Sequence, residues 1–250
     1  MEKTTEKADA GSFVQKCINA NLPYSVFVDC TATEQIPSHY SKLLEHSISI
    51  STPNKVAISG NYKEYSSLKE KANKNSKYYE IMREAQSYFS VSINNSEEAL
   101  KYMNNRDFSI EDIRKFEIGF SLNKWDGLLN YLNEKKYDTN DLIELGLVRK
   151  NENGNIFDYY RNRIIFPIYN DSMKLVGFGG RTIEKDSSIP KYVNSPDSKI
   201  FKKGKELFGL YNKGENIRKK GLAILMEGYL DVLTAHKYGF NNSIASLGTS

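Results

Sequence analysis

The stretch from Leu222 to Asp231, which reads Leu-Ala-Ile-Leu-Met-Glu-Gly-Tyr-Leu-Asp, most constrains the fold of this chain. Its apolar run up to Met226 predicts a strand that is covered on both faces. Glu227 then falls at the carboxyl end of that strand, the edge where open α/β sheets place their ligands. Gly228 lets the backbone turn sharply, and the helix that follows carries Asp231 in its first turn. The pattern therefore predicts a strand–helix junction that bears two carboxylates.

The two carboxylates have two interpretations. Acidic side chains on one junction can bind a divalent cation or act as acid and base. However, an acidic residue in a first helical turn also stabilises the helix dipole, and strands often end in a glutamate without any function. The junction alone leaves both interpretations open.

Charge is distributed unevenly along the chain. A length of 250 residues allows one large or two small domains. The chain carries a net charge of +4 and is 39% hydrophobic. Between Arg181 and Lys220 there are eleven Lys and Arg residues against five Asp and Glu, a net charge of +6, so the remainder sums to −2. A basic stretch punctuated by Gly and Pro attracts phosphates. A solvated lysine-rich surface is the other interpretation.

Several classes of protein are disfavoured. No apolar run approaches the roughly 18 residues of a membrane span, and the N-terminus lacks the apolar core of a signal peptide. Cys17 and Cys30 are too few for a disulfide framework. The three histidines do not combine with them at structural-zinc spacing. We therefore expect a cytoplasmic protein without a membrane partner, and zinc is doubtful.

The first part of the chain has few signals. Alternation of apolar and polar residues at 24–28 and 47–51 predicts two short strands, and residues 64–77 predict a polar helix or a linker. A helical block begins near Tyr78. Ser96 is expected to cap one helix, Ser109 with Asp112 to form a capping box, and Thr139 to cap another helix.

From Leu147 the pattern changes to strands joined by tight turns, the first of them at Asn153-Gly154. Arg161 and Arg163 lie two residues apart and are expected on one face of a strand. The glycines of 177–180 lack the Walker arrangement and predict close backbone approach within a strand. The last thirty residues predict a parallel βαβ unit. The aromatic residues before this region, among them Phe116, Phe120 and Trp125, are expected to pack in the core.

In their order and spacing, several segments resemble the catalytic core of bacterial replicative primases, enzymes that make short RNA primers on single-stranded DNA. Two further segments resemble the opening of the TOPRIM fold, which primases share with topoisomerases. The resemblance runs from about Tyr78 to Ser250. The segments that carry it are 157–168, 174–181, 190–196 and 200–204 for the primase core, and 227–231 and 245–249 for the TOPRIM opening.

The resemblance implies an α/β fold, in which an α+β N-terminal part of the primase core precedes the start of a TOPRIM α/β sheet. We expect residues 76–217 to form the N-terminal subdomain of the catalytic core and residues 218–250 an incomplete beginning of the TOPRIM domain. Residues 1–75 have no assignment, because they do not show the Cys/His pairs of the zinc ribbon with which bacterial primases normally begin.

The resemblance also implies catalytic roles for the two carboxylates. Glu227 matches a glutamate that acts as a metal ligand or as a general acid/base, and Asp231 supports it. The expected cofactor is Mg²⁺ or Mn²⁺. The family uses an Asp-x-Asp pair as its main metal ligands, which we expect beyond Ser250. The chain as written is therefore expected to be truncated, inactive, and less stable than a longer version, since its last strands leave an exposed edge.

The remaining matched positions line a basic groove in primases. This groove holds the single-stranded DNA template and the ribonucleoside triphosphates, and the RNA primer grows there. Family members also dock a replicative helicase. Tyr192 is suited to stacking on a base, although core packing is an equal interpretation. The candidate nucleic-acid and nucleotide ligands are Arg161, Arg163, Arg181, Lys191, Tyr192, Asn194 and Lys203.

Three functions remain to be weighed. The first is a DNA-directed RNA polymerase of the primase type. The second is a non-catalytic, primase-like module that binds single-stranded nucleic acid. The third, a TOPRIM nuclease or topoisomerase, is disfavoured because nothing resembles a topoisomerase's tyrosine domain.

Overall fold

The computed structural model describes residues 9–20, 25–46, 48–53, 62–170, 172–184, 186, 188–210 and 214–247. The chain divides into two compact units, Met1–Lys77 and Tyr78–Ser250. Within the described ranges, no helix combines the length and the apolar character that crossing a membrane requires.

The first unit is a small α/β arrangement around two parallel strands. Strand β1 pairs with β2, and Phe27 lies opposite Ile50. The two predicted strands are thereby confirmed, although Tyr24 and Ser47 lie outside the described residues. Phe27 is buried against the helices, whereas Val26 and Val28 are 57% and 61% exposed, so one face of this pair is open. The elements are α1 (Ala10–Ala20), β1 (Val26–Val28), η1 (Pro37–His39), α2 (Tyr40–Glu45) and β2 (Ser49–Ser51).

A long helix, α4 (Tyr62–Asn94), contributes to both units. The polar residues 64–77, which allowed a helix or a linker, are therefore helical. From Tyr78 onward the apolar face predicted by the helical spacing is confirmed, since Tyr78, Ile81, Met82 and Phe89 are fully buried.

Shorter helices of the second unit begin at their predicted caps in two cases out of three. Ser96 accepts the Ala99 N–H at 3.2 Å, and Ser109 forms the capping box with Asp112. The third prediction is wrong, because Asp138 caps α8 through the Asn140 N–H at 2.7 Å and Thr139 is already helical. The helices are α5 (Glu97–Asn104), α6 (Ile110–Lys115), α7 (Gly127–Glu134), α8 (Thr139–Glu144), α9 (Glu215–Lys220) and α10 (Tyr229–Lys237).

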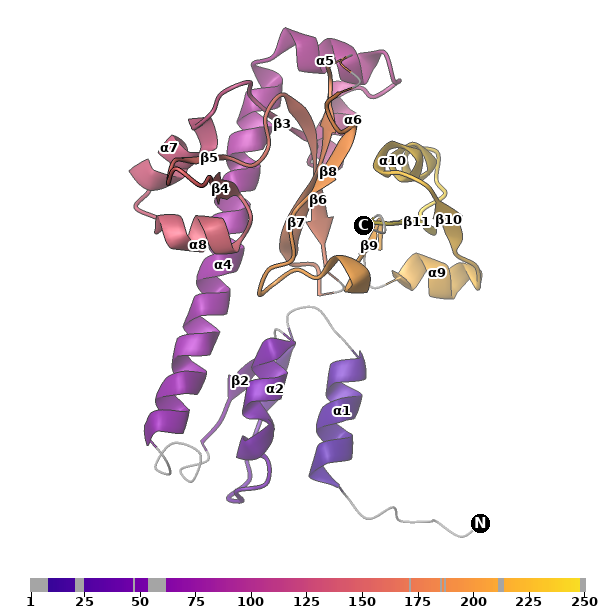
Figure 1. Cartoon of the computed structure of the whole chain (residues 1–250). Coiled ribbons are helices and arrows are strands. Elements are labelled where there is room, and N and C mark those ends of the chain that lie inside the picture. Colours follow the sequence, from indigo (N-terminus) through magenta and orange to yellow (C-terminus); the bar gives the residue numbers. More distant parts are fainter. Residues whose placement is uncertain are drawn as a thin grey trace. The chain divides into compact units, whose positions relative to one another are not determined.

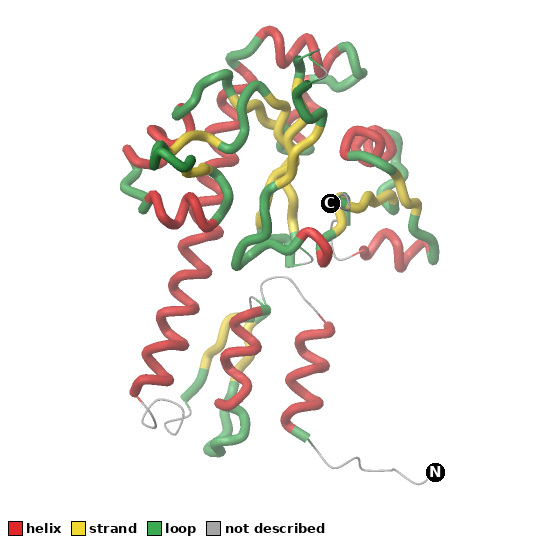
Figure 2. Tube along the Cα trace, viewed as in Figure 1, coloured by secondary structure: helices red, strands yellow, loops and turns green. Residues whose placement is uncertain are grey.

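A four-stranded antiparallel sheet forms the centre of the second unit, in the order β3-β6-β7-β8 (Figures 1 and 2). A separate hairpin pairs β4 with β5, and Gly154 at its predicted turn adopts a φ of 85°. The strands are β3 (Gly119–Ser121), β4 (Val148–Lys150), β5 (Ile156–Asp158), β6 (Arg163–Tyr169), β7 (Leu175–Thr182) and β8 (Tyr192–Asn194).

Both faces of this sheet are covered by helices (Figure 1). On one face, Ile165 and Phe178 pack against α4, α7 and α8. On the other, Ile164 and Phe166 pack against α5, α6 and α10. Alternate residues of one strand thus serve two cores, as the period of two requires.

A three-stranded sheet follows in the order β10-β11-β9, formed by β9 (Leu207–Phe208), β10 (Ile224–Met226) and β11 (Ser243–Ser246). Strands β10 and β11 are parallel, which confirms the predicted βαβ unit. The expectation that this strand is covered on both faces is wrong, because β10 is an edge strand and Leu225 is 72% exposed. In the described part of the chain, the helix α10 covers only one of its faces.

Candidate nucleic-acid interface

The two predicted carboxylates lie where β10 passes into α10. Glu227 follows the strand directly, Gly228 is the N-terminal cap residue of α10, and Asp231 stands in the first turn. Both acidic side chains are exposed. A Cβ atom on Gly228 would lie 3.3 Å from Oδ2 of Asp231, so the glycine allows that carboxylate to approach the backbone. We call Glu227, Gly228 and Asp231 the acidic junction.

Tyr229 joins the acidic junction to the four-stranded sheet. Its side chain is buried, and its hydroxyl donates to Oδ1 of Asn194 in β8 at 2.5 Å. The Asn194 amide nitrogen donates in turn to the carbonyl of Leu247, just after β11. Asn194 is therefore bonded to both carboxyl ends of the parallel pair, the edge at which such sheets place ligands. Its side-chain oxygen and nitrogen are both engaged within the chain.

Two further predicted residues lie beside Asn194. Tyr192 in β8 is the partner of Arg181 in β7. The Arg181 guanidinium donates to the hydroxyls of Tyr102 and Tyr192 and lies 4.9 Å from the centre of the Tyr192 ring. Arg181 is half-buried, so these contacts fix the direction of its charge.

The two predicted lysines lie outside the strands of this sheet. Lys191 is exposed and directly precedes β8. Lys203 is half-buried at the start of η2 (Lys203–Lys205), where its backbone N–H donates to the Asp197 carboxylate at 3.1 Å. Their ammonium groups are the flexible cations that suit a shifting phosphate.

Arg161 and Arg163 do not share a face, which corrects the prediction. Asn162 between them adopts a φ of 51°, so the chain kinks before β6 begins. Arg163 is 7% exposed and donates to the Pro190 carbonyl at 2.8 Å. Burial also lowers the pKa of its guanidinium. It anchors the loop before β8 and does not present its charge to solvent.

Arg161 instead lies over Trp125, at 3.4 Å from the ring centre. The prediction of a core tryptophan is wrong, because Trp125 is 64% exposed. Phe157 meets the ring edge-on at 5.8 Å. The Arg161 Nη1 atom is buried and has no hydrogen-bond partner among the described residues. We call Trp125, Phe157 and Arg161 the Trp125 platform, an exposed aromatic ring with a cation stacked on it.

A buried residue, Asp158, holds the backbone of this platform. Asp158 accepts the N–H groups of Leu128 and Leu129 at 2.8 and 2.9 Å, and so caps α7 from the neighbouring strand. Its own N–H donates to the Trp125 carbonyl at 2.7 Å. Burial raises the pKa of Asp158 to about 6.

Sequence reasoning missed three of these residues. Trp125 stands in a polar stretch, Asn-Lys-Trp-Asp-Gly, outside any helical apolar pattern, and this was the available signal for exposure. Tyr229 is the only aromatic residue between the two carboxylates of the acidic junction. Asp158 gave no signal, because the helix that it caps begins 31 residues earlier, with Gly127.

The acidic junction supplies the oxygen ligands that Mg²⁺ and Mn²⁺ prefer. No group of three or more acidic, histidine or cysteine side chains that would enclose a cation occurs in the part of the chain that the structure describes. The residues present thus fit one flank of a divalent-cation site, which Glu227 and Asp231 would line.

Two family models match the chain. Residues 88–214, more than half of it, match the model described as DNA primase catalytic core, N-terminal domain. Residues 1–81 match the model described as the NAD binding domain of homoserine dehydrogenase.

Curated relatives agree with the first model. A DNA primase of Clostridium acetobutylicum is 40% identical over 193 residues, which are 75% of this chain and 30% of the relative. A DNA primase of Halalkalibacterium halodurans is 47% identical over 150 residues, which are 60% of this chain and 25% of the relative. The chain thus spans less than a third of the length of these relatives.

Solved structures share the fold. The RNA polymerase domain of Mycobacterium tuberculosis primase DnaG, in complex with a double-stranded DNA oligomer with a 6-nucleotide overhang, matches with a TM-score of 0.65 and 31% identity, over 70% of this chain and 55% of that one. A DnaG primase catalytic domain bound to single-stranded DNA matches with a TM-score of 0.64 and 34% identity, over 72% and 58%.

The described residues of the first unit do not fit the nicotinamide dinucleotide that the second family model implies. Such sites place the pyrophosphate at a helix N-terminus behind a glycine-rich turn, and an acidic residue on a ribose. Here the Asp9 carboxylate accepts the Ser12 N–H at 2.7 Å and so occupies the N-terminus of α1. Asp29 is 2% exposed, and its carboxylate accepts from Tyr40 at 2.6 Å and from the Thr31 N–H at 2.8 Å.

Proposed function

Because this chain belongs to the DNA primase catalytic core family, we propose that it is part of a DNA-directed RNA polymerase that makes short RNA primers on single-stranded DNA. The observation that carries the proposal is the docking of the acidic junction onto β8. Through Tyr229 and Asn194, two carboxylates are held beside a strand flanked by Lys191 and Arg181.

Primer synthesis joins a 3′-hydroxyl to the α-phosphate of a ribonucleoside triphosphate, and its transition state is strongly anionic. When bound, Mg²⁺ or Mn²⁺ activates the attacking oxygen and stabilises the leaving pyrophosphate. In the proposal, Glu227 and Asp231 hold the cation, with Glu227 also suited to accept a proton. Lys191, Lys203 and Arg181 neutralise phosphates of the nucleotide and the template.

The template contact in this proposal is the Trp125 platform. Bases stack on exposed aromatic rings regardless of sequence, and a cation under the ring adds to the attraction for a phosphate backbone. The Trp125 ring is exposed and its backbone carbonyl is held by Asp158, so a base can stack without rearrangement of the chain.

The finer assignments rest on the family resemblance. We propose that β10, α10 and β11 open a TOPRIM sheet, with residues 76–217 before it as the N-terminal subdomain of the core. A replicative helicase partner, a place in the primosome and a cytoplasmic location are part of the same proposal.

Ribonucleotide incorporation on single-stranded DNA tests the chemistry, in the protein that contains this chain and with Mg²⁺ or Mn²⁺. Glu227→Gln keeps the shape of the side chain but removes its charge and its basicity. We expect incorporation to fall by about 100-fold or more, with DNA binding retained. Binding without synthesis by the unaltered protein would replace the enzyme with the non-catalytic binding module.

Trp125 offers a direct test of template binding, because it is the only tryptophan of the chain. Addition of a single-stranded oligonucleotide should quench its fluorescence, and Trp125→Ala should weaken binding by about 1–3 kcal/mol. Phe240→Ala is the matched control, since Phe240 is also exposed, at 54%, and has the Lys220 cation 5.9 Å from its ring centre. Equal losses in both variants would remove the platform from the interface.

A further inference from the structure

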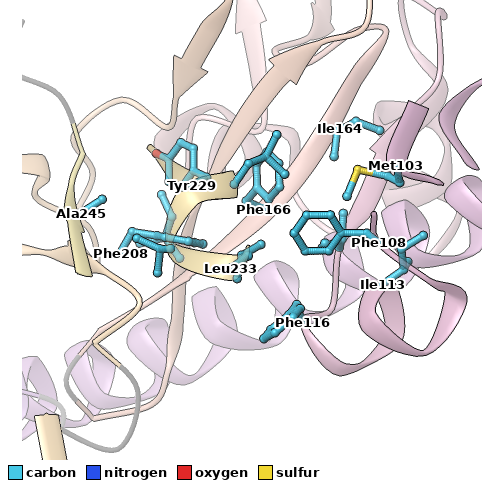
Figure 3. Packing of buried hydrophobic residues seen from close by; sticks show 14 of the residues in the cluster. Met103, Phe108, Ile113, Phe116, Ile164, Phe166, Phe208, Tyr229, Leu233 and Ala245 are labelled. Atoms are coloured by element: carbon cyan, nitrogen blue, oxygen red, sulfur yellow. The ribbon is translucent and has the colours of Figure 1, made fainter. Parts of the chain in front are cut away.

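The ring of Tyr229 fills a socket on the four-stranded sheet (Figure 3). It stacks on Phe166 at 5.3 Å with an interplanar angle of 12°, and it meets Phe208 edge-on at 4.5 Å. Tyr192 lies at 6.0 Å on a third side. The tyrosine is the first residue of α10 and is separated from Glu227 by Gly228 alone. The acidic junction is therefore attached to the sheet by its own neighbour in sequence.

A glycine forms the floor of the socket. A Cβ atom on Gly179 would lie 2.5 Å from Cζ of Tyr229 and 2.8 Å from its hydroxyl oxygen, closer than real Cβ atoms approach. Gly179 is also the partner of Asn194 in the pairing of β7 with β8. The hydroxyl end of the ring thus lies against β7 at Gly179, and the hydroxyl reaches the side chain directly across the ladder.

Asn194 is bound on three sides. Its Oδ1 accepts from Tyr229, its amide nitrogen donates to the Leu247 carbonyl, and its backbone carbonyl accepts from the Tyr159 hydroxyl at 3.0 Å. One carboxamide therefore connects the starts of the two segments that follow β10 and β11. A side chain with both polar ends engaged in this way is poorly placed to bind a nucleotide and well placed to hold two loops together.

We propose that Tyr229 and Asn194 are positioning residues, which fix the acidic junction at a set distance from the basic strand β8. In this assignment Asn194 acts through Tyr229 and does not contact the nucleotide. The assignment rests on the proposed function for its consequence in catalysis, while the anchoring itself is a property of the fold.

Hydrogen exchange in this chain tests the anchoring without any activity. Tyr229→Phe keeps the ring in the socket and removes only the bond to Asn194. One lost hydrogen bond should speed exchange about five-fold at the first bonded amide of α10, that of Val232, which donates to Gly228. Amides of the β6–β7 pair should be unchanged. Tyr238→Phe is the control, since it removes a hydroxyl from the end of the same helix, where Tyr238 donates to Asp107 at 2.8 Å.

A double-mutant cycle separates the bond from its surroundings. Asn194→Ala also releases Leu247, so it should speed exchange more than Tyr229→Phe does. Adding Tyr229→Phe to Asn194→Ala should then change nothing further, because the shared bond is already lost. Additive effects, or faster exchange spread equally over β6 and β7, would overturn the anchoring and leave a merely structural tyrosine.

Kinetics of primer synthesis then test the consequence, in the protein that contains this chain. Both variants should lower kcat, on the order of 10- to 100-fold, with KM for the nucleotide and the affinity for DNA unchanged. A raised KM with an unchanged kcat would make Asn194 a nucleotide ligand and overturn the proposal. If even the unaltered protein makes no primers, the proposed function fails, and the exchange result still decides whether Tyr229 anchors the junction.

Discussion

The four-stranded and three-stranded sheets of the second unit differ in how deeply one of their strands is buried. Strand β6 is buried at every residue except its last, and its side chains serve a core on each face. Strand β10, by contrast, has no fully buried residue. The contrast is between these two strands, because β11 beside β10 is buried at every residue except its last.

The difference separates scaffold from chemistry. The buried sheet holds β8 and its cations in place through many contacts. The carboxylates that the proposed chemistry needs stand instead after the edge strand β10. Its sheet shares a core with the scaffold through Tyr229 and α10, and also through Phe208 and Ala245. Because β10 itself is little buried, the position of the carboxylates after it depends on few contacts. Loss of one of those contacts should therefore affect the proposed chemistry.

Truncation of one large side chain in each sheet gives the sharpest contrast. Phe178 is fully buried in β7 and meets Phe89 edge-on at 5.2 Å. Phe178→Ala should therefore lower the free energy of unfolding by about 3–5 kcal/mol. Leu225→Ala in β10 should change it by less than about 0.5 kcal/mol, because that side chain is already in solvent. Urea denaturation followed by Trp125 fluorescence measures both, and similar losses would erase the distinction between the sheets.

A smaller difference in stability is expected between alanine substitutions at two glycines, Gly119 in β3 and Gly228 after β10. A Cβ atom on Gly119 in β3 would lie 2.5 Å from Cβ of Phe89 and 3.0 Å from its backbone carbon. Because a buried helix backbone does not yield easily, Gly119→Ala should cost about 1–3 kcal/mol. Among the described residues, the only neighbour of a Cβ added at Gly228 is the carboxylate end of Asp231, at 3.3 Å. Gly228→Ala should leave stability within about 0.5 kcal/mol, and a large loss there would show that the acidic junction is as tightly packed as the scaffold.

Local signals in the sequence predicted local structure well. Ser96, and Ser109 with Asp112, cap helices as expected because a capping hydrogen bond involves residues only a few positions apart. The parallel βαβ unit followed from its period and its short connections. The glycines of 177–180 were expected to allow close approach, and Gly179 does so against Tyr229.

Exposure and direction could not be predicted, because they depend on residues far away in the chain. Trp125 and Leu225 are as apolar as core residues, yet they are 64% and 72% exposed. Arg161 and Arg163 diverge because Asn162 adopts a left-handed backbone conformation, which asparagine tolerates but does not require. For the same reason the pattern named Glu227 and Asp231 but gave no hint of the socket that holds Tyr229.

A buried carboxylate on the scaffold side should give the unfolding free energy a distinct pH dependence. The pKa of Asp158 is about 6 in the fold and near 3.8 when the chain is unfolded. Between these values the folded state binds more protons than the unfolded state, so this group makes the protein more stable as the pH falls from about 6 to 4. Asp158→Asn should flatten the profile in that window and cost about 1 kcal/mol near pH 7, since one backbone N–H loses its acceptor.

Urea midpoints at several pH values between 4 and 7.5 measure this dependence. Leu225→Ala provides the control from the other sheet and should keep the profile of the unaltered chain. An Asp158→Asn profile that stays parallel to it would show that Asp158 does not titrate in the window.

The smallest effect concerns the far end of α10, where a salt link supplements Tyr229. The Lys237 ammonium lies 3.1 Å from the Asp112 carboxylate and 3.2 Å from that of Asp107, and it also donates to the Asp107 carbonyl. Lys237→Met should lower the urea midpoint slightly, and the loss should vanish in 1 M salt, where charges are screened within about 3 Å. Lys219→Met is the matched control, because its pair with Glu215 lies within one exposed helix and links nothing else. If Lys237→Met lowered the urea midpoint as much as Phe178→Ala does, both ends of α10 would hold the three-stranded sheet in place. Tyr229 would then not be its main anchor.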